Sequence, residues 1–573
     1  MIYFKEVNLQ YEPFYWLNDV SRTFLSRGYL SEGETPEQRI RDIANTAERL
    51  NGISGFSDKF YSYMSKGWYS LSTPVWTNFG KARGEPVSCF NSHVTDDIGG
   101  ILYAQAEVGV MSKLGGGTSG YFGDVRPRGA PITDNGKSTG VVHFLELFQA
   151  TTNVISQGSS RRGRMAPYLP ISHPDIEEFL DVATDNHPIQ DMNHAVVVDS
   201  DWMQEMVDGD KDKRTLWAKL LKRRKEIGFP YLMFRTNAND QAPAMYKDKG
   251  KIINSSNLCN EIYLPSSEDE SFTCILSSMN LLHYDEWKDT DAVETLTYFL
   301  DTVATEFLTK LEAYRDSPNR DKQLTFRYME RAYNFTKRHR ALGLGVLGLS
   351  SLYMSKMLPF ESREAAKLNI EIFKLIQAKT KKASRELAAM FGEPEMCKGY
   401  GVRNTTLMAI APTTSSAAIL GQVSQSIEPP MSNYYVKDMA KVKTVIKNKY
   451  LEQLLESKGF NTPEVWSLIA DNDGSVLGLD DSILTPEEKE VFLTFAEISP
   501  DAIIDQAAVR QSYIDQGQSL NLMIPSSYTA KEINRLHIKA WQMGLKGLYY
   551  QHGVNAAQVF TRAKNSACKA CEG

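Results

Sequence analysis

Cysteine, long apolar runs and excess charge of one sign are all scarce in this chain. Only 6 cysteines occur among 573 residues, too few for the disulfide framework of a small secreted protein. No window approaches the ~18 uninterrupted apolar residues of a membrane span. The N-terminus lacks the basic and then apolar order of a secretion signal. These absences predict a cytoplasmic protein with no membrane partner, whose thiols are kept reduced.

The charge balance excludes a further class of function. The chain has 64 Lys and Arg against 70 Asp and Glu, a formal net charge of −6, which argues against nucleic acid as the main partner. The hydrophobic fraction of 42% is too high for a disordered chain. We therefore expect a large globular protein with either several folding units or one very large architecture.

The pattern along the chain predicts an α/β fold. The first ~65 residues are helical in character, with Ile40, Ile43 and Ala47 at helical spacing. Further on, short apolar segments expected as strands alternate with long amphipathic segments expected as helices. The expected strands include 194–198, 252–264, 405–410 and 518–524, and the expected helices include 292–314, 363–391 and 531–543. The polar segment after Tyr550 predicts a mobile tail.

The strongest local signal is the sequence Asn257-Leu258-Cys259-Asn260-Glu261. In an extended segment alternate residues point to one side, so Asn257, Cys259 and Glu261 would share a face. A thiol can form a thiolate or a radical, a carboxylate can act as a general base, and an amide can bind a hydroxyl. Taken alone, the segment is also compatible with a buried strand cysteine between polar neighbours.

The other cysteines leave several interpretations open. Cys274 and Cys89 lie in apolar, strand-like segments that are typical of a protein core. Cys568 and Cys571 form a C-x-x-C near the end of the chain, which suits a redox dithiol or half of a zinc site. No second C-x-x-C or C-x-x-H completes a zinc site. A tail dithiol that exchanges with another disulfide fits better, and we predict no metal site in this chain.

Three segments could bind anions. The glycine cluster 114–120 lets backbone approach a ligand closely, although it matches neither common nucleotide-binding pattern. Pro412-Thr413-Thr414-Ser415-Ser416 runs into an apolar helix, as either a phosphate site or an ordinary helix cap. The basic loop 158–164 is either a solvated turn or a phosphate contact. A tyrosine pair, Tyr549-Tyr550, could relay electrons, although tyrosine neighbours are unremarkable among 27 tyrosines.

Taken together and in order, these residues resemble the large, catalytic subunit of class I ribonucleotide reductase. The resemblance covers about Ser72 to Gly573 and depends on a series of elements. The series consists of Thr73-Pro74, Ser88-Cys89, the glycine-rich turn, Asn257-x-Cys259-x-Glu261, Cys274, the Pro-Thr-Thr-Ser-Ser turn, Tyr549-Tyr550 and the terminal cysteine pair.

The resemblance implies a mechanism for these residues. A radical from a separate small subunit would pass through Tyr550 and Tyr549 to make a thiyl at Cys259, which would remove the 3′ hydrogen of a ribonucleotide. Glu261 would take the 3′-hydroxyl proton, and Asn257 would hydrogen-bond nearby. Cys89 would protonate the departing 2′ hydroxyl, and Cys89 and Cys274 would end as a disulfide. Cys568 and Cys571 would reduce that disulfide and be reduced in turn by a thioredoxin or glutaredoxin.

The resemblance also implies binding residues. The substrate, a ribonucleoside diphosphate, would contact a set of hydroxyls and backbone amides: Thr73, Ser88, Gly116, Gly117, Thr414, Ser415 and Ser416. A dNTP or ATP would bind as an allosteric specificity effector at the interface of a homodimer. Asp96 and Arg126 would contact that effector, and Arg161 and Arg162 would pass its signal to the substrate. No cofactor would bind this chain, because the radical or metal cofactor belongs to the small subunit. Cys397 matches no family role and is expected to be structural.

The implied fold is a ten-stranded α/β barrel of two five-stranded halves. We expect a helical N-terminal region at 1–70, the barrel at 71–555 and a flexible redox tail at 556–573. The ~90-residue ATP-cone found in many members is not expected here, because too few residues precede the barrel. Two alternatives remain: the adenosylcobalamin-dependent class, which needs no tyrosine relay, and a non-catalytic nucleotide-binding regulator that kept the fold.

Overall fold

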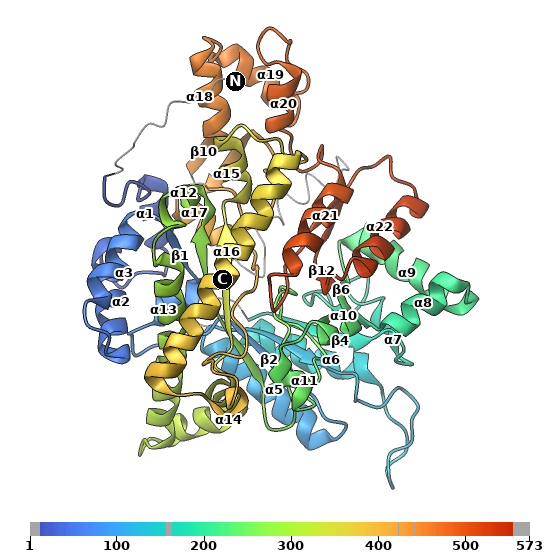
Figure 1. Ribbon diagram of the computed structural model, residues 1–573. Helices are drawn as coiled ribbons and strands as arrows, with labels where there is room; N and C mark the ends of the chain where they lie inside the picture. Colours follow the sequence, from blue (N-terminus) through green and yellow to red (C-terminus); the bar gives the residue numbers. More distant parts are fainter. Residues whose placement is uncertain (1–11, 156–162, 422, 440–441, 554–573) are drawn as a thin grey trace.

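The computed structural model describes residues 12–155, 163–421, 423–439 and 442–553 (Figure 1). The tail cysteines Cys568 and Cys571 and the loop arginines Arg161 and Arg162 lie outside these residues, so the predictions for them stay untested. The boundaries that we predict between the N-terminal region, the barrel and the tail also stay predictions. Within the described part of the chain, no helix is both long and apolar enough to cross a membrane.

The N-terminal region is helical, as predicted. It comprises α1 (Asp19–Leu25), α2 (Pro36–Asn51) and α3 (Phe56–Ser65), which lie along one flank in Figure 1. Helix α2 begins at a capping box, in which the Thr35 side chain accepts from the Gln38 amide and the Gln38 side chain accepts from the Thr35 amide. Its buried face carries Ile40, Ile43 and Ala47. The helical spacing in the sequence therefore marks the face that packs on the rest of the protein.

Five parallel strands form the first half of a barrel. Their order is β2 (Cys89–His93), β3 (Gly117–Tyr121), β4 (Met165–Pro170), β5 (Ala195–Val198) and β6 (Tyr231–Phe234). The intervening helices are α5 (Ile98–Lys113), α6 (Val141–Val154), α7 (Ile176–Phe179), α8 (Ser200–Asp208) and α9 (Lys211–Ile227). Strand, helix and parallel strand succeed one another here, as the alternating sequence pattern predicts.

The second half consists of β7, β8 and three shorter segments, all in parallel order. Strand β7 (Phe272–Asn280) pairs with β8 (Leu342–Leu347), single bridges join Leu344 to Met408 and Ile410 to Gln518, and β11 (Leu522–Ile524) pairs with β13 (Gln551–Gly553). Antiparallel pairing joins the halves at both sides, β2 to β7 and β12 (Gly547–Leu548) to β6. Five segments in each half close the ring, which agrees with the ten-stranded barrel that the resemblance implies.

Long helices cover the second half. They are α13 (Ala292–Arg315), α14 (Arg320–His339), α16 (Arg363–Phe391), α21 (Pro500–Gln511) and α22 (Ala530–Gln542). Helix α16 has the limits predicted from the sequence. The remaining short elements are β1 (Tyr69–Leu71), α4 (Thr73–Asn78), α10 (Arg235–Asp240), α11 (Ala244–Asp248), α12 (Tyr284–Trp287), α15 (Leu349–Ser355), α17 (Thr414–Ile419) and the 3-10 turns at Leu281–His283 and Glu395–Cys397.

A separate lobe stands at the top of Figure 1. It contains the hairpin of β9 (Tyr434–Met439) and β10 (Val442–Lys447), followed by α18 (Lys449–Ser457), α19 (Pro463–Asp471) and α20 (Pro486–Val491). These helices enclose a small apolar core of their own around Leu451, Trp466 and Phe492. The lobe is therefore an insertion into the second half of the barrel.

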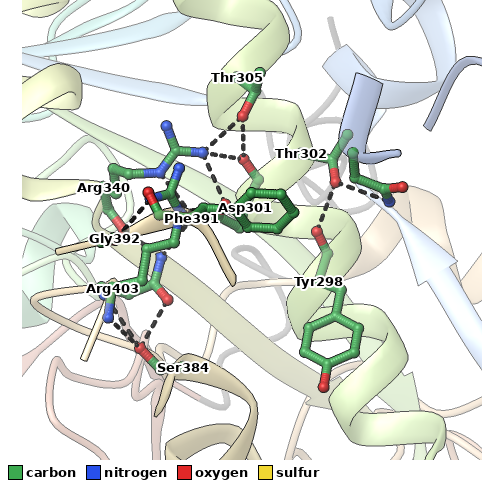
Figure 2. A network of polar contacts seen from close by, with 11 residues as sticks. Tyr298, Asp301, Thr302, Thr305, Arg340, Ser384, Phe391, Gly392 and Arg403 are labelled. Carbon is green, nitrogen blue, oxygen red and sulfur yellow. Dashed lines mark hydrogen bonds and ion pairs between the residues drawn. The ribbon is translucent and has the colours of Figure 1, made fainter. Parts of the chain in front are cut away.

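A buried ion-pair network ties the outer helices to the barrel (Figure 2). Asp301 on α13 accepts two hydrogen bonds from Arg340, at 2.7 and 2.8 Å, and one from Arg403 at 3.0 Å. Arg340 ends α14 in the left-handed conformation and directly precedes the segment that forms β8. Burial alone would raise the pKa of Asp301, but the two guanidinium groups outweigh it and lower that pKa. The network fixes where β8 begins.

Candidate functional site

The inner apolar cluster of the barrel contains four of the cysteines, three of which the resemblance assigns to the reaction. Along each strand alternate side chains point inward, so Ala195 and Val197 of β5 lie in the inner apolar cluster while Val196 and Val198 face the helices. The same inner cluster holds Cys89, Cys259, Cys274 and Cys397, together with Tyr549. Residues that are remote in the sequence thus meet inside one closed ring of strands.

Cys89 and Cys274 lie directly opposite each other on neighbouring strands. They are register partners in the antiparallel pair of β2 and β7, and both thiols are free. Opposite residues of such a pair have Cα atoms about 4.5–5.5 Å apart, within the range of about 4.4–6.8 Å that a disulfide spans. The strand register therefore allows this dithiol to close into a disulfide without moving the backbone.

Burial keeps both thiols protonated. It raises the pKa of Cys89 well above the usual thiol value, and it raises the pKa of Cys274 as well. Asn257 donates from Nδ2 to the Cys89 sulfur at 3.2 Å, and Gln516 donates from Nε2 to the Cys274 sulfur at 3.5 Å. Each sulfur thus has an amide neighbour that orients it, and the pair can supply hydrogen and electrons as thiols.

The segment that carries Cys259 is a loop with a turn, and the strand predicted at 252–264 is wrong. Residues 258–260 form the turn, and Asn260 has a left-handed φ of 60°. The Asn257 Oδ1 atom accepts from the amides of Glu261 at 2.9 Å and Ile262 at 3.1 Å. A side chain that binds nearby backbone amides competes with strand pairing, which explains the failure of the alternating pattern. The turn, rather than one face of a strand, therefore brings the amide of Asn257, the thiol of Cys259 and the carboxyl of Glu261 into one segment.

The carboxyl of Glu261 is buried beside Ser519. The Ser519 Oγ atom lies 3.1 Å from Glu261 Oε2 and 2.6 Å from the carbonyl oxygen of Cys259. Burial raises the pKa of Glu261 to about 7, although hydrogen bonds from Asn257 and Ser519 oppose the shift. A carboxyl with a pKa near neutrality is suited to exchange a proton with a bound hydroxyl.

The pKa of Glu261 predicts an acid limb in the pH profile of catalysis. A general base acts in its deprotonated form, so kcat/KM should fall as the pH drops below about 7 and level off above it. Glu261→Gln should lower kcat by about 10²–10⁴-fold. Glu306→Gln, which changes another buried carboxyl with a raised pKa on the outer helix α13, is the control. An unchanged acid limb in Glu261→Gln would assign that limb to another group.

Three tyrosine rings form a cluster between the barrel interior and its surface. The ring centroids of Tyr549 and Tyr550 are 4.4 Å apart, and the ring of Tyr231 on β6 lies 4.5 Å from Tyr549 and 5.1 Å from Tyr550. Asn193 donates to the Tyr231 hydroxyl at 2.8 Å and also to the Tyr550 hydroxyl. Tyr549 is 1% exposed while Tyr550 is half-buried. The pair therefore has an inner and an outer member.

The hydroxyls of Ser88 and Thr73, which are predicted to hold the substrate, have different hydrogen-bonding surroundings. Ser88 precedes Cys89, and its hydroxyl is buried with no hydrogen-bond partner among the described residues. Thr73 begins helix α4, and Pro74 lies in the first turn, where a helix tolerates proline. The Thr73 hydroxyl lies 3.1 Å from the hydroxyl of Tyr29.

Gly116 and Gly117 do not offer free amides. Their N–H groups donate to the carbonyl oxygens of Met111 and Ser88, at 3.0 and 2.9 Å. A Cβ at Gly116 would lie 2.2 Å from the ring of Phe90, so packing requires a glycine at this position. Both N–H groups are thus engaged within the protein, and the substrate-binding role of Gly116 and Gly117 stays a prediction.

The segment 412–416 contains the start of helix α17, whose first three residues are Thr414, Ser415 and Ser416. It follows Ile410, whose bridge to Gln518 is part of the barrel. Thr414 donates from Oγ1 to Gln425 Oε1 at 3.1 Å, and Thr414, Ser415 and Ser416 are all partly exposed. Hydroxyls thus lie at the carboxyl end of a barrel segment, and among the described residues no side-chain hydrogen bond caps the start of α17.

Comparisons with known proteins decide the family. The family model described as "Ribonucleotide reductase, barrel domain" matches residues 87–213, 210–399 and 393–551, and "Ribonucleotide reductase, all-alpha domain" matches residues 15–84. The chain belongs to the ribonucleotide reductase large-subunit family.

Relatives of this family cover nearly the whole chain. The large subunit of ribonucleoside-diphosphate reductase from Invertebrate iridescent virus 3 is 30% identical, covering 92% of this chain and 92% of its own length. The large subunit from Caenorhabditis elegans is 30% identical over 88% of this chain and 72% of its own length. The Actinobacillus ureae class Id ribonucleotide reductase alpha subunit superposes with a TM-score of 0.88 at 52% identity, covering 96% of this chain and 99% of that one. The chain is a reductase subunit of class I, and the adenosylcobalamin-dependent alternative is not favoured.

Two of the predicted effector residues meet on the surface. Arg126 donates from Nε to both carboxylate oxygens of Asp96, at 3.0 and 2.8 Å, and its backbone amide donates to Asp96 Oδ1 at 2.9 Å. These contacts join the start of α5 to the loop after β3. The role of Asp96 and Arg126 in binding an effector stays a prediction.

Several residues around the ribonucleotide reductase site were missed by sequence reasoning. Ser519, Gln516, Tyr231 and Asn193 each contact a predicted site residue from a distant segment. None belongs to a local pattern, since each contact joins segments that are far apart in the sequence. Cys397 lies outside the group of three, with its sulfur 3.8 Å from that of Met245.

Proposed function

We propose that this chain reduces ribonucleoside diphosphates to 2′-deoxyribonucleotides through a thiyl radical at Cys259. The observation that carries the proposal is the placement of Cys89 opposite Cys274, with the Asn257 amide on the Cys89 sulfur. A reducible dithiol in register, beside a third buried thiol and a carboxyl with a near-neutral pKa, provides the groups that this reduction needs.

The proposed steps use groups that this chain supplies. The Cys259 thiyl takes the 3′ hydrogen atom of the substrate, and Glu261 accepts the 3′-hydroxyl proton. Cys89 protonates the 2′ hydroxyl, which leaves as water. Cys89 and Cys274 give two electrons and form a disulfide, and the proton of the second thiol completes the new C2′–H bond. Glu261 returns its proton to the 3′ oxygen, and the hydrogen atom then returns from Cys259 to C3′. The raised pKa values of the two thiols support this part, since a protonated Cys89 can act as the acid.

We propose that the oxidising equivalent comes from a separate small subunit, which holds the radical or metal cofactor. It reaches Cys259 through Tyr550 and then Tyr549. The greater exposure of Tyr550 supports this order, because the outer ring must meet the partner and the inner ring must meet the thiol.

The remaining assignments complete the proposal. Cys568 and Cys571 reduce the Cys89–Cys274 disulfide, and a thioredoxin or glutaredoxin reduces them. The substrate contacts Thr73, Ser88, Thr414, Ser415 and Ser416.

The chain acts as a homodimer with a dNTP or ATP effector near Asp96 and Arg126. The exposed apolar side chains of Ile98, Leu102, Leu147 and Val154 on α5 and α6 support a second copy as the partner of that face.

The test is reduction of CDP or ADP by the purified chain with dithiothreitol and an effector. We expect turnover when a radical-bearing small subunit is added and none with the chain alone. Adenosylcobalamin in place of the small subunit is the control and should give no product. Turnover with adenosylcobalamin alone would refute the tyrosine route while leaving the three-cysteine chemistry intact. No turnover with a range of small subunits would favour the non-catalytic regulator.

A further inference from the structure

We propose that Asn260 is a positioning residue that sets the hydrogen-atom transfer between Tyr549 and Cys259. The proposal rests on the proposed function, because it assumes that the radical travels from Tyr549 to this thiol. Asn260 belongs to none of the predicted roles, and the extended interpretation of the sequence placed it away from Cys259 and Glu261.

The side chain of Asn260 uses all of its hydrogen-bonding capacity inside the protein. Its Nδ2 atom donates to the carbonyl oxygens of Leu232 at 3.0 Å and Leu548 at 3.2 Å. Its Oδ1 atom lies 3.3 Å from the hydroxyls of Tyr168 and Tyr263, each of which shares its one proton between this oxygen and a backbone carbonyl oxygen. Asn260 is 0% exposed. A buried amide with two donors and two acceptors engaged is held in one orientation.

The two carbonyl groups belong to the seam between the barrel halves. Leu232 on β6 and Leu548 on β12 are register partners in the antiparallel pair that closes the barrel. One side-chain amide therefore fastens the loop to both strands of the seam. The neighbouring residue Gly547 leaves room for it, since a Cβ at Gly547 would lie 2.7 Å from Asn260 Nδ2.

The backbone conformation at Asn260 fits the same role. Its φ of 60° is left-handed, a region that asparagine tolerates better than most residues with a side chain. The hydroxyl of Tyr263 also donates to the Asn260 carbonyl oxygen at 3.1 Å, and the Tyr168 hydroxyl donates to the Asn257 carbonyl oxygen at 2.7 Å. Two buried tyrosines thus hold both ends of the turn.

This arrangement ties the hydrogen donor to the hydrogen acceptor. Cys259 directly precedes Asn260, and Tyr549 directly follows Leu548, so one hydrogen bond links the residues next to them. In the transfer, the S–H bond of Cys259 breaks and the O–H bond of Tyr549 forms. The tyrosyl radical gains one electron and one proton, and the cysteine becomes a thiyl. A displacement of about 1 Å can cost a reaction about 10²-fold, so this step is sensitive to where the loop sits.

Two variants test the proposal in the complex with the small subunit. Asn260→Asp keeps the size and the tolerance for positive φ but places an acceptor against two carbonyl oxygens. Asn260→Gly keeps the positive φ and removes the side chain without adding charge. Asn186→Asp is the matched control, since Asn186 also has a positive φ, of 65°, but is exposed on the surface.

We expect kcat to fall about 10–100-fold in both Asn260 variants. The stoichiometry and Kd of CDP binding should stay within twofold of wild type. The 3′-deuterium isotope effect on kcat/KM should be no larger than in wild type, because delivery of the radical, rather than removal of the 3′ hydrogen, becomes slower. The control should match wild type in all three measurements.

Each other outcome overturns the proposal. Binding stoichiometry that falls in step with kcat would mean that Asn260 serves only to keep the chain folded. An isotope effect above that of wild type would place its influence on the substrate rather than on Tyr549. Full activity in both variants would mean that the loop holds its place without this side chain. Failure of the proposed function is distinguishable, because then wild type itself shows no turnover with the small subunit.

Discussion

Cys259→Ser should abolish ribonucleotide reduction while leaving the fold and nucleotide binding intact. An alcohol O–H bond is much harder to break homolytically than a thiol S–H bond, so serine at this position cannot accept the radical from Tyr549. The side chain is buried in the inner cluster, and oxygen replaces sulfur with little change of shape. We expect turnover to fall at least about 10³-fold, the scale seen when a covalently acting group is removed. The measurement is CDP reduction with the small subunit, alongside effector binding.

Cys397→Ser is the matched control for this prediction. Cys397 is also buried in the inner cluster, but its sulfur contacts Met245 rather than the group around Cys89. Its loss should leave kcat within a few fold of wild type. Equal loss of turnover in both variants would mean that any buried thiol is needed for folding. Measurable turnover by Cys259→Ser would refute a thiyl at this residue. A regulator without catalysis would show no turnover in wild type, so neither variant would change a measured property.

The parts of the site that the sequence predicts are those that a motif in one segment can carry. Cys259 and Glu261 are identifiable from the sequence because a thiol and a carboxyl two residues apart could act together, as a radical or thiolate and a general base. The long helices follow from periodicity, and α16 has the predicted limits because Ser362 caps its start and Gly392 follows its end. The family resemblance then supplies the barrel, which local patterns alone could not have specified.

Two features of the site depend on tertiary structure and were not accessible from local patterns. The pairing of Cys89 with Cys274 is a matter of register between β2 and β7, and a shift of one residue would send one thiol out of the barrel. The alternating side chains at 257–261 predict a strand, but the structure has a loop there. The Asn257 side chain captures two backbone amides, and Asn260 takes a positive φ. These side-chain bonds override the alternating pattern.

Removal of the Asp301 carboxylate should have the largest effect on stability that the structure predicts. Asp301→Ala would leave the buried Arg340 and the partly buried Arg403 without the carboxylate that balances their charges (Figure 2). Breaking a buried pair by removing one partner costs about 3–5 kcal/mol, because the remaining charge cannot be solvated. The midpoint of urea unfolding should fall accordingly. Glu37→Ala, which removes a partner from the exposed Arg22–Glu37 pair, should cost at most about 1 kcal/mol.

The dependence of this effect on pH follows from the lowered pKa of Asp301. A carboxyl whose pKa is lower in the folded state stabilises the protein above its unfolded pKa of about 3.9, and that stability is lost as the pH falls. The difference in the free energy of unfolding between wild type and Asp301→Ala should therefore be constant near neutrality and shrink in acid.

A stability cost no larger than that of Glu37→Ala would show that β8 and the outer helices hold their places without the network. A difference that grew in acid would contradict the lowered pKa, since protonation of the wild-type carboxyl can only bring the two proteins closer in stability.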